Sequence, residues 1–259
     1  MFSNKTILLT GAAGGIGSEI AIALSAAGAT LVLVGLEQNN LDQLNQNIGG
    51  QHHTLTADIA TSEGRDKILQ YCQKLTDGID ILINNAGIGQ FSLFQDMDSE
   101  HISAIININL TGTILLTQTL LPTLLERPKA QVVNIGSTLG SIGFPGSSVY
   151  CASKFGIRGF TEALNRELSD TSVQVSYFAP RATKTTINDD KVVAMNKELG
   201  TKMDSPEQVA HAFVAFLESS EKTGHIGWPE KLFVKINSVL PNIVDKSIIK
   251  QLPIIKRHL

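Results

Sequence analysis

The chain has 259 residues, of which 42% are hydrophobic and 17% charged, a composition that fits a folded interior and excludes extended disorder. α/β domains reach this length around one core, so length alone does not require two domains. The formal net charge of −3 provides no basic face for nucleic acid. The two cysteines, Cys72 and Cys151, show no metal-ligand spacing and no secreted disulfide pattern, so we expect a reducing cytoplasm.

The N-terminal segment, 1–10, lacks the basic region and long apolar stretch of a secretion signal. No run of roughly 20 uninterrupted apolar residues is present, and a membrane-crossing helix needs about that many. We therefore expect no membrane-spanning helix, whereas contact along a membrane surface is left open.

The first 50 residues alternate strand and helix patterns. Residues 6–10 form a short apolar run, followed by glycines and then by a helix pattern that stops at Gly28. Residues 31–34 predict a second strand, and the helix after it stops at the Gly49–Gly50 pair.

The same alternation continues along the chain. Strands are predicted at 53–57, 79–83, 131–135 and 173–178, with a helix from about Tyr150 to Leu168. This order predicts an α/β fold: a Rossmann-like three-layer sandwich with a doubly wound parallel sheet. Ligands of such sheets bind at the carboxyl ends of the strands.

A glycine-rich turn follows the first strand. Gly11, Gly15 and Gly17 give the spacing G-x-x-x-G-x-G. Missing side chains let backbone N–H groups approach a pyrophosphate at a helix N-terminus. The alternative is a tight turn that only permits close strand–helix packing.

Tyr150 and Lys154 are four residues apart on the predicted helix, so their side chains share one face. A phenol is a poor base at neutral pH, but a nearby ammonium favours its phenolate. The pair therefore predicts a lowered pKa for Tyr150 and an acid/base role.

Further polar residues follow the predicted strands: Asp58 and Ile59 after the third, Asn85-Ala86-Gly87 after the fourth, and Ser137 after the fifth. Together with the glycine turn, Asn109 and the Tyr150–Lys154 pair, they resemble the short-chain dehydrogenase/reductase family. The resemblance covers about the first 220 residues, in order and at the family's spacings.

The resemblance implies a role for each of these residues. Ser137 holds the substrate oxygen, Tyr150 exchanges its proton, and Lys154 also hydrogen-bonds the nicotinamide ribose. Asn109 anchors a proton-relay water or, alternatively, only bends its helix. The implied cofactor-binding residues are Gly11, Gly15, Ile16, Gly17, Glu37, Asp58, Ile59, Asn85, Ala86, Gly87, Tyr150, Lys154, Pro180 and Thr185. Asp58 has a second interpretation, as a cap of the following helix.

Two departures from the family pattern concern the cofactor. Pro180 is followed by Arg181 where the family has glycine, which indicates an altered loop or simply a solvated arginine. The second strand ends in Gly35-Leu36-Glu37, with neither the acid common in NAD users nor the arginine of NADP users. Because no cation is present for a 2′-phosphate and Glu37 can reach ribose hydroxyls, NAD is favoured over NADP.

The last residues change in character. We expect residues 1–228 to form one dinucleotide-binding and catalytic domain, and 229–259 to form an amphipathic extension packed on it. The extension has six basic and two acidic residues, a formal charge of +4 against −7 for the remainder. It can cover the substrate cleft, pack between subunits or lie on an anionic membrane, and the first two uses are favoured. An apolar lid is expected over 186–202, which suits an apolar substrate.

These observations predict an NAD(P)-dependent oxidoreductase that transfers a hydride between nicotinamide and a carbonyl or secondary alcohol. The expected partners are a small-molecule substrate and further copies of the chain, with no nucleic acid and no metal. The alternative is a catalytically silent dinucleotide-binding sensor or scaffold, which would not need a phenol beside an ammonium.

Overall fold

The computed structural model describes residues 2–219 and 221–259. Its centre is a seven-stranded sheet in the order β3-β2-β1-β4-β5-β6-β7, and every neighbouring pair is parallel. The strands are β1 (Thr6–Thr10), β2 (Thr30–Gly35), β3 (His53–Thr56), β4 (Ile81–Asn84), β5 (Ala130–Ile135), β6 (Val173–Ala179) and β7 (Thr223–His225). The predicted strands are confirmed to within two residues, and the three-residue β7 was not anticipated.

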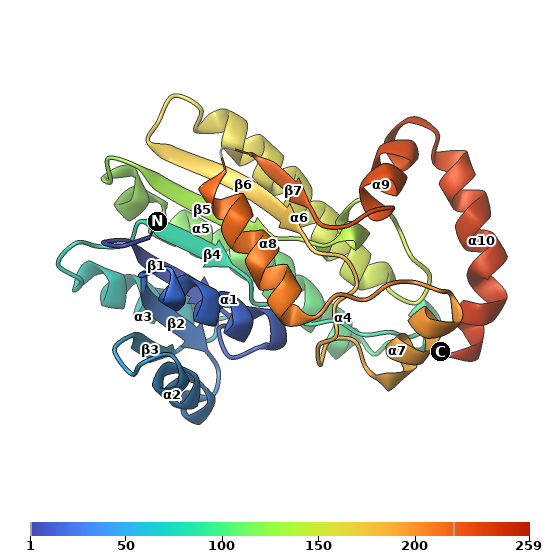
Figure 1. The fold of residues 1–259 in the computed structure, drawn as a ribbon, viewed down its shortest axis with the longest axis horizontal. Helices are drawn as coiled ribbons and strands as arrows, with labels where there is room; N and C mark the ends of the chain where they lie inside the picture. Colours follow the sequence, from blue (N-terminus) through green and yellow to red (C-terminus); the bar gives the residue numbers. More distant parts are fainter. Residues whose placement is uncertain (1, 220) are drawn as a thin grey trace.

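Helices cover both faces of the sheet (Figure 1). On one face lie α1 (Gly15–Ala26), α2 (Gln38–Asn47) and α8 (Pro206–Glu218). On the other lie α3 (Ser62–Gln73), α5 (Thr113–Leu125) and α6 (Ser148–Glu167). The doubly wound, three-layer arrangement is therefore confirmed.

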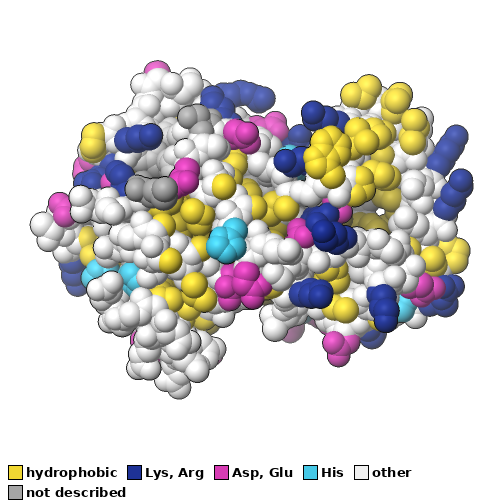
Figure 2. All heavy atoms as spheres, viewed as in Figure 1, with side chains coloured by type: hydrophobic (Ala, Val, Ile, Leu, Met, Phe, Trp, Pro, Cys, Tyr) yellow, Lys and Arg dark blue, Asp and Glu magenta, His cyan; other side chains and the backbone are white. Residues whose placement is uncertain are grey.

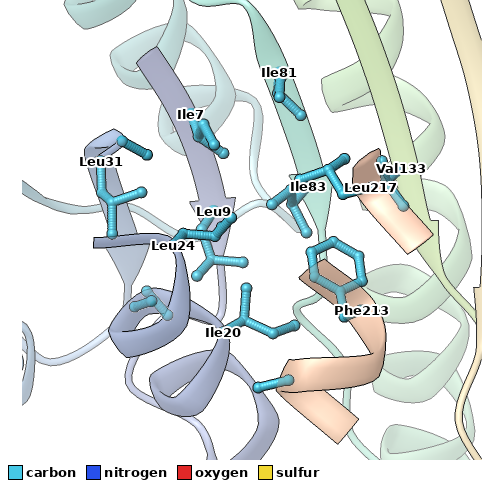
Figure 3. Close-up of a cluster of buried hydrophobic side chains, with 14 of the residues drawn as sticks. Ile7, Leu9, Ile20, Leu24, Leu31, Ile81, Ile83, Val133, Phe213 and Leu217 are labelled. Carbon is cyan, nitrogen blue, oxygen red and sulfur yellow. The ribbon is translucent and has the colours of Figure 1, made fainter. Parts of the chain in front are cut away.

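Side-chain alternation along β1 explains why both faces need helices. Ile7 and Leu9 point toward α1 and α8, whereas Leu8 packs with the opposite layer, and all three are fully buried. Figure 3 shows the first of these cores, where Leu24 of α1 and Phe213 of α8 close over the strands. Two-sided burial is typical of parallel sheets and requires the continuous apolar strands seen in the sequence.

Among the described residues, one helix is long and apolar enough, by length and composition alone, to cross a membrane. It runs over Ser99–Leu125 and joins α4 (Ser99–Ile106), a π-helical segment (Asn107–Gly112) and α5. Leu116, Leu120 and Leu124 are fully buried against the sheet. The segment is therefore a core helix of the domain.

The final residues form α9 (Glu230–Val239) and α10 (Pro241–Arg257), which stand at one end of the molecule beside α7 (Asp190–Glu198; Figure 1). Val234 and Val244 are buried with Ile142 of the loop after β5. Near the chain end, Ile255 is fully buried in a cluster that also contains Val192 and Met195 of α7. The expected lid thus includes α7, and the extension packs against it.

Candidate active site

A cavity of about 520 Å³ opens at the carboxyl ends of β1, β2, β4, β5 and β6. It brings together most of the residues that the sequence suggested. Those lining it are Gly11, Gly15, Ile16, Gly17, Glu37, Asn85, Ala86, Gly87, Ser137, Tyr150, Lys154, Pro180 and Thr185. Three of the suggested residues, Asp58, Ile59 and Asn109, do not line it.

The glycine turn leaves room for a pyrophosphate beside the first turn of α1. Gly11 has a φ of +61°, and a Cβ atom at Gly17 would lie 2.1 Å from the carbonyl oxygen of Gly11. A Cβ atom at Gly15 would meet the Thr185 side chain at 2.8 Å. No side chain caps the start of α1, so its first N–H groups face the cavity. The turn therefore fits the phosphates of a dinucleotide.

Thr10 fixes this turn to the neighbouring strand end, a role that the sequence analysis missed. Its hydroxyl accepts hydrogen bonds from the backbone N–H groups of Asn85 and Ala86, each at 3.0 Å. The Asn85 amide in return donates to the carbonyl oxygens of Thr10 and Gly11, at 3.0 and 3.1 Å. These four hydrogen bonds thus join the carboxyl ends of β1 and β4 at the base of the cavity.

The backbone of Ser137 is held by two hydrogen bonds to Tyr177 of β6. The Tyr177 hydroxyl donates to the Ser137 carbonyl oxygen at 3.0 Å and accepts from the Ser137 N–H at 3.2 Å. Gly136 and Gly140 pass so close to Tyr177 that a Cβ atom at either would lie within 2.3 Å of that side chain. Tyr177 therefore acts as a positioning residue for the Ser137 backbone.

Tyr150 and Lys154 share one face of α6, as the spacing predicted, and the Lys154 Nζ lies 5.7 Å from the centre of the Tyr150 ring. Burial raises the pKa of Tyr150 to about 12, and a hydrogen bond between the Ser137 and Tyr150 hydroxyls acts in the opposite direction. Burial lowers the pKa of Lys154 to about 8. The expected lowering of the Tyr150 pKa is therefore wrong for the protein alone, because desolvation is the largest cause of the shift and Lys154 is not among its causes.

Asn109 lies behind the cavity, in the π-helical segment Asn107–Gly112, with 1% of its surface exposed. Its amide oxygen accepts from the Ile88 N–H at 2.8 Å, and its amide nitrogen donates to the Ile88 carbonyl at 2.8 Å and the Ser153 hydroxyl at 3.1 Å. Both N–H groups of the side chain and one acceptor position of its oxygen are thus used in clamping the loop after β4 to α6. π turns often occur at functional sites, and this one points the amide at Ile88.

Asp58 and Ile59 serve local structure. The Asp58 carboxylate accepts from the Ala60 N–H at 2.9 Å, while Thr61 provides the N-cap of α3. Ile59 is 4% exposed and belongs to the core under the sheet. The interpretation of Asp58 as the cap of α3 is therefore wrong. Its carboxylate binds the N–H of Ala60, which precedes the helix, and the cap is Thr61, three residues later.

The end of β2 exposes a surface without cations to the cavity. Leu36 is 63% exposed, and Gly35, Glu37 and Asn40 line the cavity with it. The cations among the described lining residues are Lys154, which donates to the Ile135 carbonyl at 2.9 Å, and Arg181, which is held by carboxylates. No described lining residue therefore offers an uncommitted cation to a 2′-phosphate.

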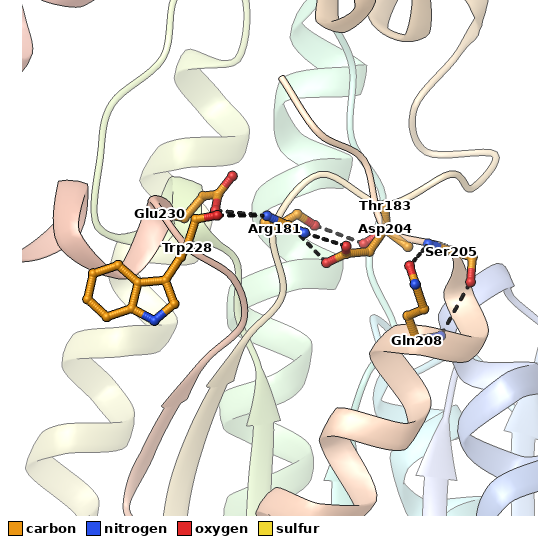
Figure 4. Close-up of polar contacts among 7 residues, drawn as sticks. All are labelled: Arg181, Thr183, Asp204, Ser205, Gln208, Trp228 and Glu230. Carbon is orange, nitrogen blue, oxygen red and sulfur yellow. Dashed lines mark hydrogen bonds and ion pairs between the residues drawn. The ribbon is translucent and has the colours of Figure 1, made fainter. Parts of the chain in front are cut away.

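Arg181 is buried, so the interpretation as a solvated loop residue is wrong. Its guanidinium makes two hydrogen bonds to the Asp204 carboxylate, at 2.6 and 2.7 Å, and a third to Glu230 at 3.0 Å (Figure 4). These bonds hold the pKa of Arg181 above its usual value. The residue joins the end of β6 to the segment before α8 and to the first turn of α9.

The substrate side of the cavity is largely apolar. Phe91, Phe144, Val192 and Met195 line it, and the latter two come from α7. Gln90 brings an amide group into this region, and its buried oxygen has no hydrogen-bond partner among the described residues. The arrangement fits an apolar substrate that carries a second polar group.

The family follows from comparison with known proteins. Residues 5–196 match the model of the short chain dehydrogenase family, which is more than half of the chain. The chain is a short-chain dehydrogenase/reductase. It is thus an NAD(P)-dependent oxidoreductase that acts on a carbonyl or alcohol group, as the sequence predicted, and the silent-scaffold alternative is not supported.

Relatives extend over almost the whole chain. The ketoacyl reductase HetN of Nostoc sp. is 33% identical over 254 residues, covering 94% of this chain and 88% of its own. The 3-oxoacyl-(acyl-carrier-protein) reductase FabG of Thermotoga maritima is 32% identical, covering 86% and 94%. The crystal structure of a 3-ketoacyl-(acyl-carrier-protein) reductase from Brucella melitensis complexed with NADH is 25% identical, with a TM-score of 0.79 over 88% of this chain and 98% of that one.

Proposed function

We propose that this enzyme reduces the 3-oxo group of an apolar acyl substrate, with NADH preferred over NADPH. The observation that carries the proposal is the cavity itself, where Ser137, Tyr150 and Lys154 meet an apolar wall that contains Gln90. The names of the relatives, which are ketoacyl reductases, point to the same substrate class.

Each residue has a defined part in this proposal. A bound nicotinamide dinucleotide supplies the hydride that adds to the carbonyl carbon. The Ser137 hydroxyl holds the substrate oxygen, and the Tyr150 hydroxyl gives that oxygen its proton as the C–O bond becomes single. Lys154 orients the dinucleotide ribose and stabilises the phenolate that remains. Gln90 adds the polar amide group to the otherwise apolar wall beside them.

The preference for NADH rests on the end of β2. Leu36 and Gly35 offer no charge to a 2′-phosphate, and Glu37 would repel one while its carboxylate can accept from ribose hydroxyls. A phosphate left without a cation in this cavity would lose hydration without compensation.

A cofactor-coupled assay tests the proposal. We expect kcat/KM for 3-oxoacyl thioesters to rise with acyl chain length, to exceed that for sugars and simple ketones, and to be higher with NADH than with NADPH. Indifference to chain length, or a preference for sugars, would contradict the proposed substrate class. Better turnover with NADPH would contradict only the NADH preference inferred from the end of β2 and would leave the substrate class standing.

Replacement of Tyr150 tests the site within the same assay. Tyr150→Phe should lower kcat by at least about 100-fold, the usual scale for losing a positioned acid, with dinucleotide affinity retained. Tyr71→Phe is the matched control, because the Tyr71 hydroxyl contacts His53 at 2.8 Å, away from the cavity-lining residues. Near-normal turnover of Tyr150→Phe would remove its assigned role.

The same proposal includes a cytoplasmic, homo-oligomeric enzyme. Both cysteines are buried thiols, which suits a reducing compartment. Phe155 of α6 and Leu125 of α5 are 43% and 41% exposed and are available for contact with another copy. Light scattering of the purified protein gives the number of copies directly.

A further inference from the structure

The outer face of α9 and the start of α10 is apolar and uncovered. Trp228 is 70% exposed, Leu232 44%, Val239 77%, Leu240 53% and Ile243 56%. These five residues are called the corner patch below, because the last three lie where α9 turns into α10. Large side chains gathered in this way are rare on a free surface and indicate a contact.

The inner face of the same two helices is already occupied. Val234 and Val244 are buried with Ile142, and the Asn237 amide donates to the Ser141 carbonyl at 2.9 Å. The helices therefore cannot turn to bury the corner patch without opening this inner cluster. What covers the patch must come from outside the chain.

Lysines surround the patch. Lys231, Lys235, Lys246 and Lys250 of the two helices are exposed. Figure 2 shows the apolar surface over α9 and the start of α10 with Lys and Arg side chains on both sides of it. Since Glu230 is paired with Arg181, Asp245 is the one acid of 229–259 without an ion pair in the described structure, and the formal charge of this segment is +4.

We propose that the corner patch docks on an anionic lipid bilayer surface. The apolar side chains would enter the boundary between headgroups and acyl chains, as in interfacial amphipathic helices. Each lysine near such a surface adds about 1 kcal/mol of attraction. Trp228 fits the same boundary, because its ring is apolar and its N–H is polar.

Charge favours lipid over a second copy of the chain as the occupant. A two-fold interface would place the corner patch of one protomer on that of its partner, because such an interface pairs the same surface with itself. The lysines of both protomers would then face one another, whereas anionic headgroups compensate them. The proposal is independent of the substrate class.

The docked position has a consequence for the cavity. Glu230 lines the cavity. The next two residues are Lys231, one of the lysines beside the corner patch, and Leu232, which belongs to the patch. Docking would therefore hold the α9 wall of the substrate cavity within one helical turn of the lipid surface.

The chain carries a single tryptophan, so its emission reports directly on the proposed surface. The full-length protein is mixed with vesicles of phosphatidylcholine alone or with 30% phosphatidylglycerol. We expect a blue shift of Trp228 emission, quenching by brominated acyl chains and co-sedimentation with the anionic vesicles only. Raising the salt to 0.5 M should weaken binding, because exposed charges are screened.

Variants separate the two contributions. Lys231→Glu with Lys235→Glu should weaken binding to anionic vesicles by at least about tenfold. Val239→Ser with Ile243→Ser should abolish the blue shift while leaving reductase activity unchanged. Lys74→Glu and Ile22→Ser are the matched controls, since both residues are exposed on other helices or their ends and should leave vesicle binding intact.

Three results would overturn the proposal. Equal binding to neutral and anionic vesicles would remove the role of the lysines, and no binding to either would remove lipid altogether. A concentration-dependent dimer that Val239→Ser with Ile243→Ser dissociates would assign the corner patch to a second copy of the chain.

Discussion

Lys154 keeps its amino group inside the protein with no carboxylate beside it in the described structure. It is 5% exposed, and its Nζ donates to the Ile135 carbonyl at 2.9 Å. A carbonyl dipole compensates an ammonium only in part, which is why burial brings the pKa of Lys154 down to about 8. The surroundings of Lys154 therefore favour the neutral amine over the ammonium.

The pH dependence of stability should report this charge. With a folded-state pKa of about 8 and an unfolded value of 10.5, the folded protein loses the Lys154 proton first. Stability then rises with pH from about 8 upward, by about 1 kcal/mol per pH unit. The gain ends near pH 10, where the unfolded chain begins to release the Tyr150 proton that the folded protein keeps.

Urea denaturation of the cofactor-free protein between pH 7 and 10 measures this slope. Lys154→Met is the comparison, because it keeps the apolar stem and removes the titrating group. Its free energy of unfolding should lack the rise that the parent protein shows between pH 8 and 10. Parallel curves for the two proteins would mean that Lys154 is not desolvated as described.

At the level of elements, Arg181 ties together three segments that are far apart in the chain. It sits just after β6, Asp204 precedes α8, and Glu230 begins α9. The Asp204 N–H also donates to the Ala182 carbonyl at 2.9 Å, so the backbone is held beside the ion pair. One guanidinium thus ties the first turn of α9 to the end of β6 and to the segment before α8.

Removing that guanidinium should be costly. Arg181→Ala leaves the Asp204 and Glu230 carboxylates without their cation, and breaking a buried pair in this way costs about 3–5 kcal/mol. Arg181→Lys should rescue only part of the loss, since an ammonium cannot bond both Asp204 oxygens in the same plane.

Thermal and urea unfolding give these differences. The double variant Arg181→Met with Asp204→Leu should recover most of the stability, because it removes both charges together. A single Arg181→Ala variant as stable as the parent protein would show that the ion pairs of Arg181 with Asp204 and Glu230 do not stabilise the fold.

At the level of the whole molecule, the last two helices belong to the walls of the site. Ile255 is fully buried with Val192 and Met195 of α7, and the latter two line the cavity. Glu198 of α7 is paired with Arg257 and His258. The lid and the chain end are therefore one packed unit.

Deletion of the residues after Trp228 should disturb the substrate side of the cavity and leave the dinucleotide side unchanged. We expect dinucleotide affinity to be retained and the KM for substrate to rise by at least about tenfold, because Val192 and Met195 lose the packing of Ile255 that fixes them in the cavity wall. If the truncated protein does not fold, Ile255→Ala probes the same contact within the full chain. Unchanged KM in both variants would make the extension dispensable for catalysis.

Much of this architecture could be predicted from local sequence. The strands of the sheet are short apolar runs whose burial on both faces leaves a strong pattern, and Gly11, Gly15 and Gly17 mark the turn at the end of the first one. Tyr150 and Lys154 could be paired from their spacing of four residues on a helix, whereas Ser137 was placed beside them only by the resemblance to the family.

The remaining features depend on contacts that local pattern does not encode. Tyr177 looks like any inward residue of β6, and only the fold brings its hydroxyl to Ser137. Arg181 resembles a solvated loop residue until the chain delivers Asp204 and Glu230 to it. The pKa of Tyr150 could not be foreseen from Lys154 alone, since burial by the surrounding loops decides its direction.

The π-helical segment Asn107–Gly112 has a consequence for how this chain tolerates length changes. A π turn contains one residue more than the α turn it replaces, so it amounts to a single-residue insertion inside a continuous helix. A deletion of one residue there would let Ser99–Leu125 wind regularly and keep Leu116 and Leu120 on the sheet. The fold would survive, but the Asn109 amide would swing away from Ile88, so an indel here would separate folding from activity.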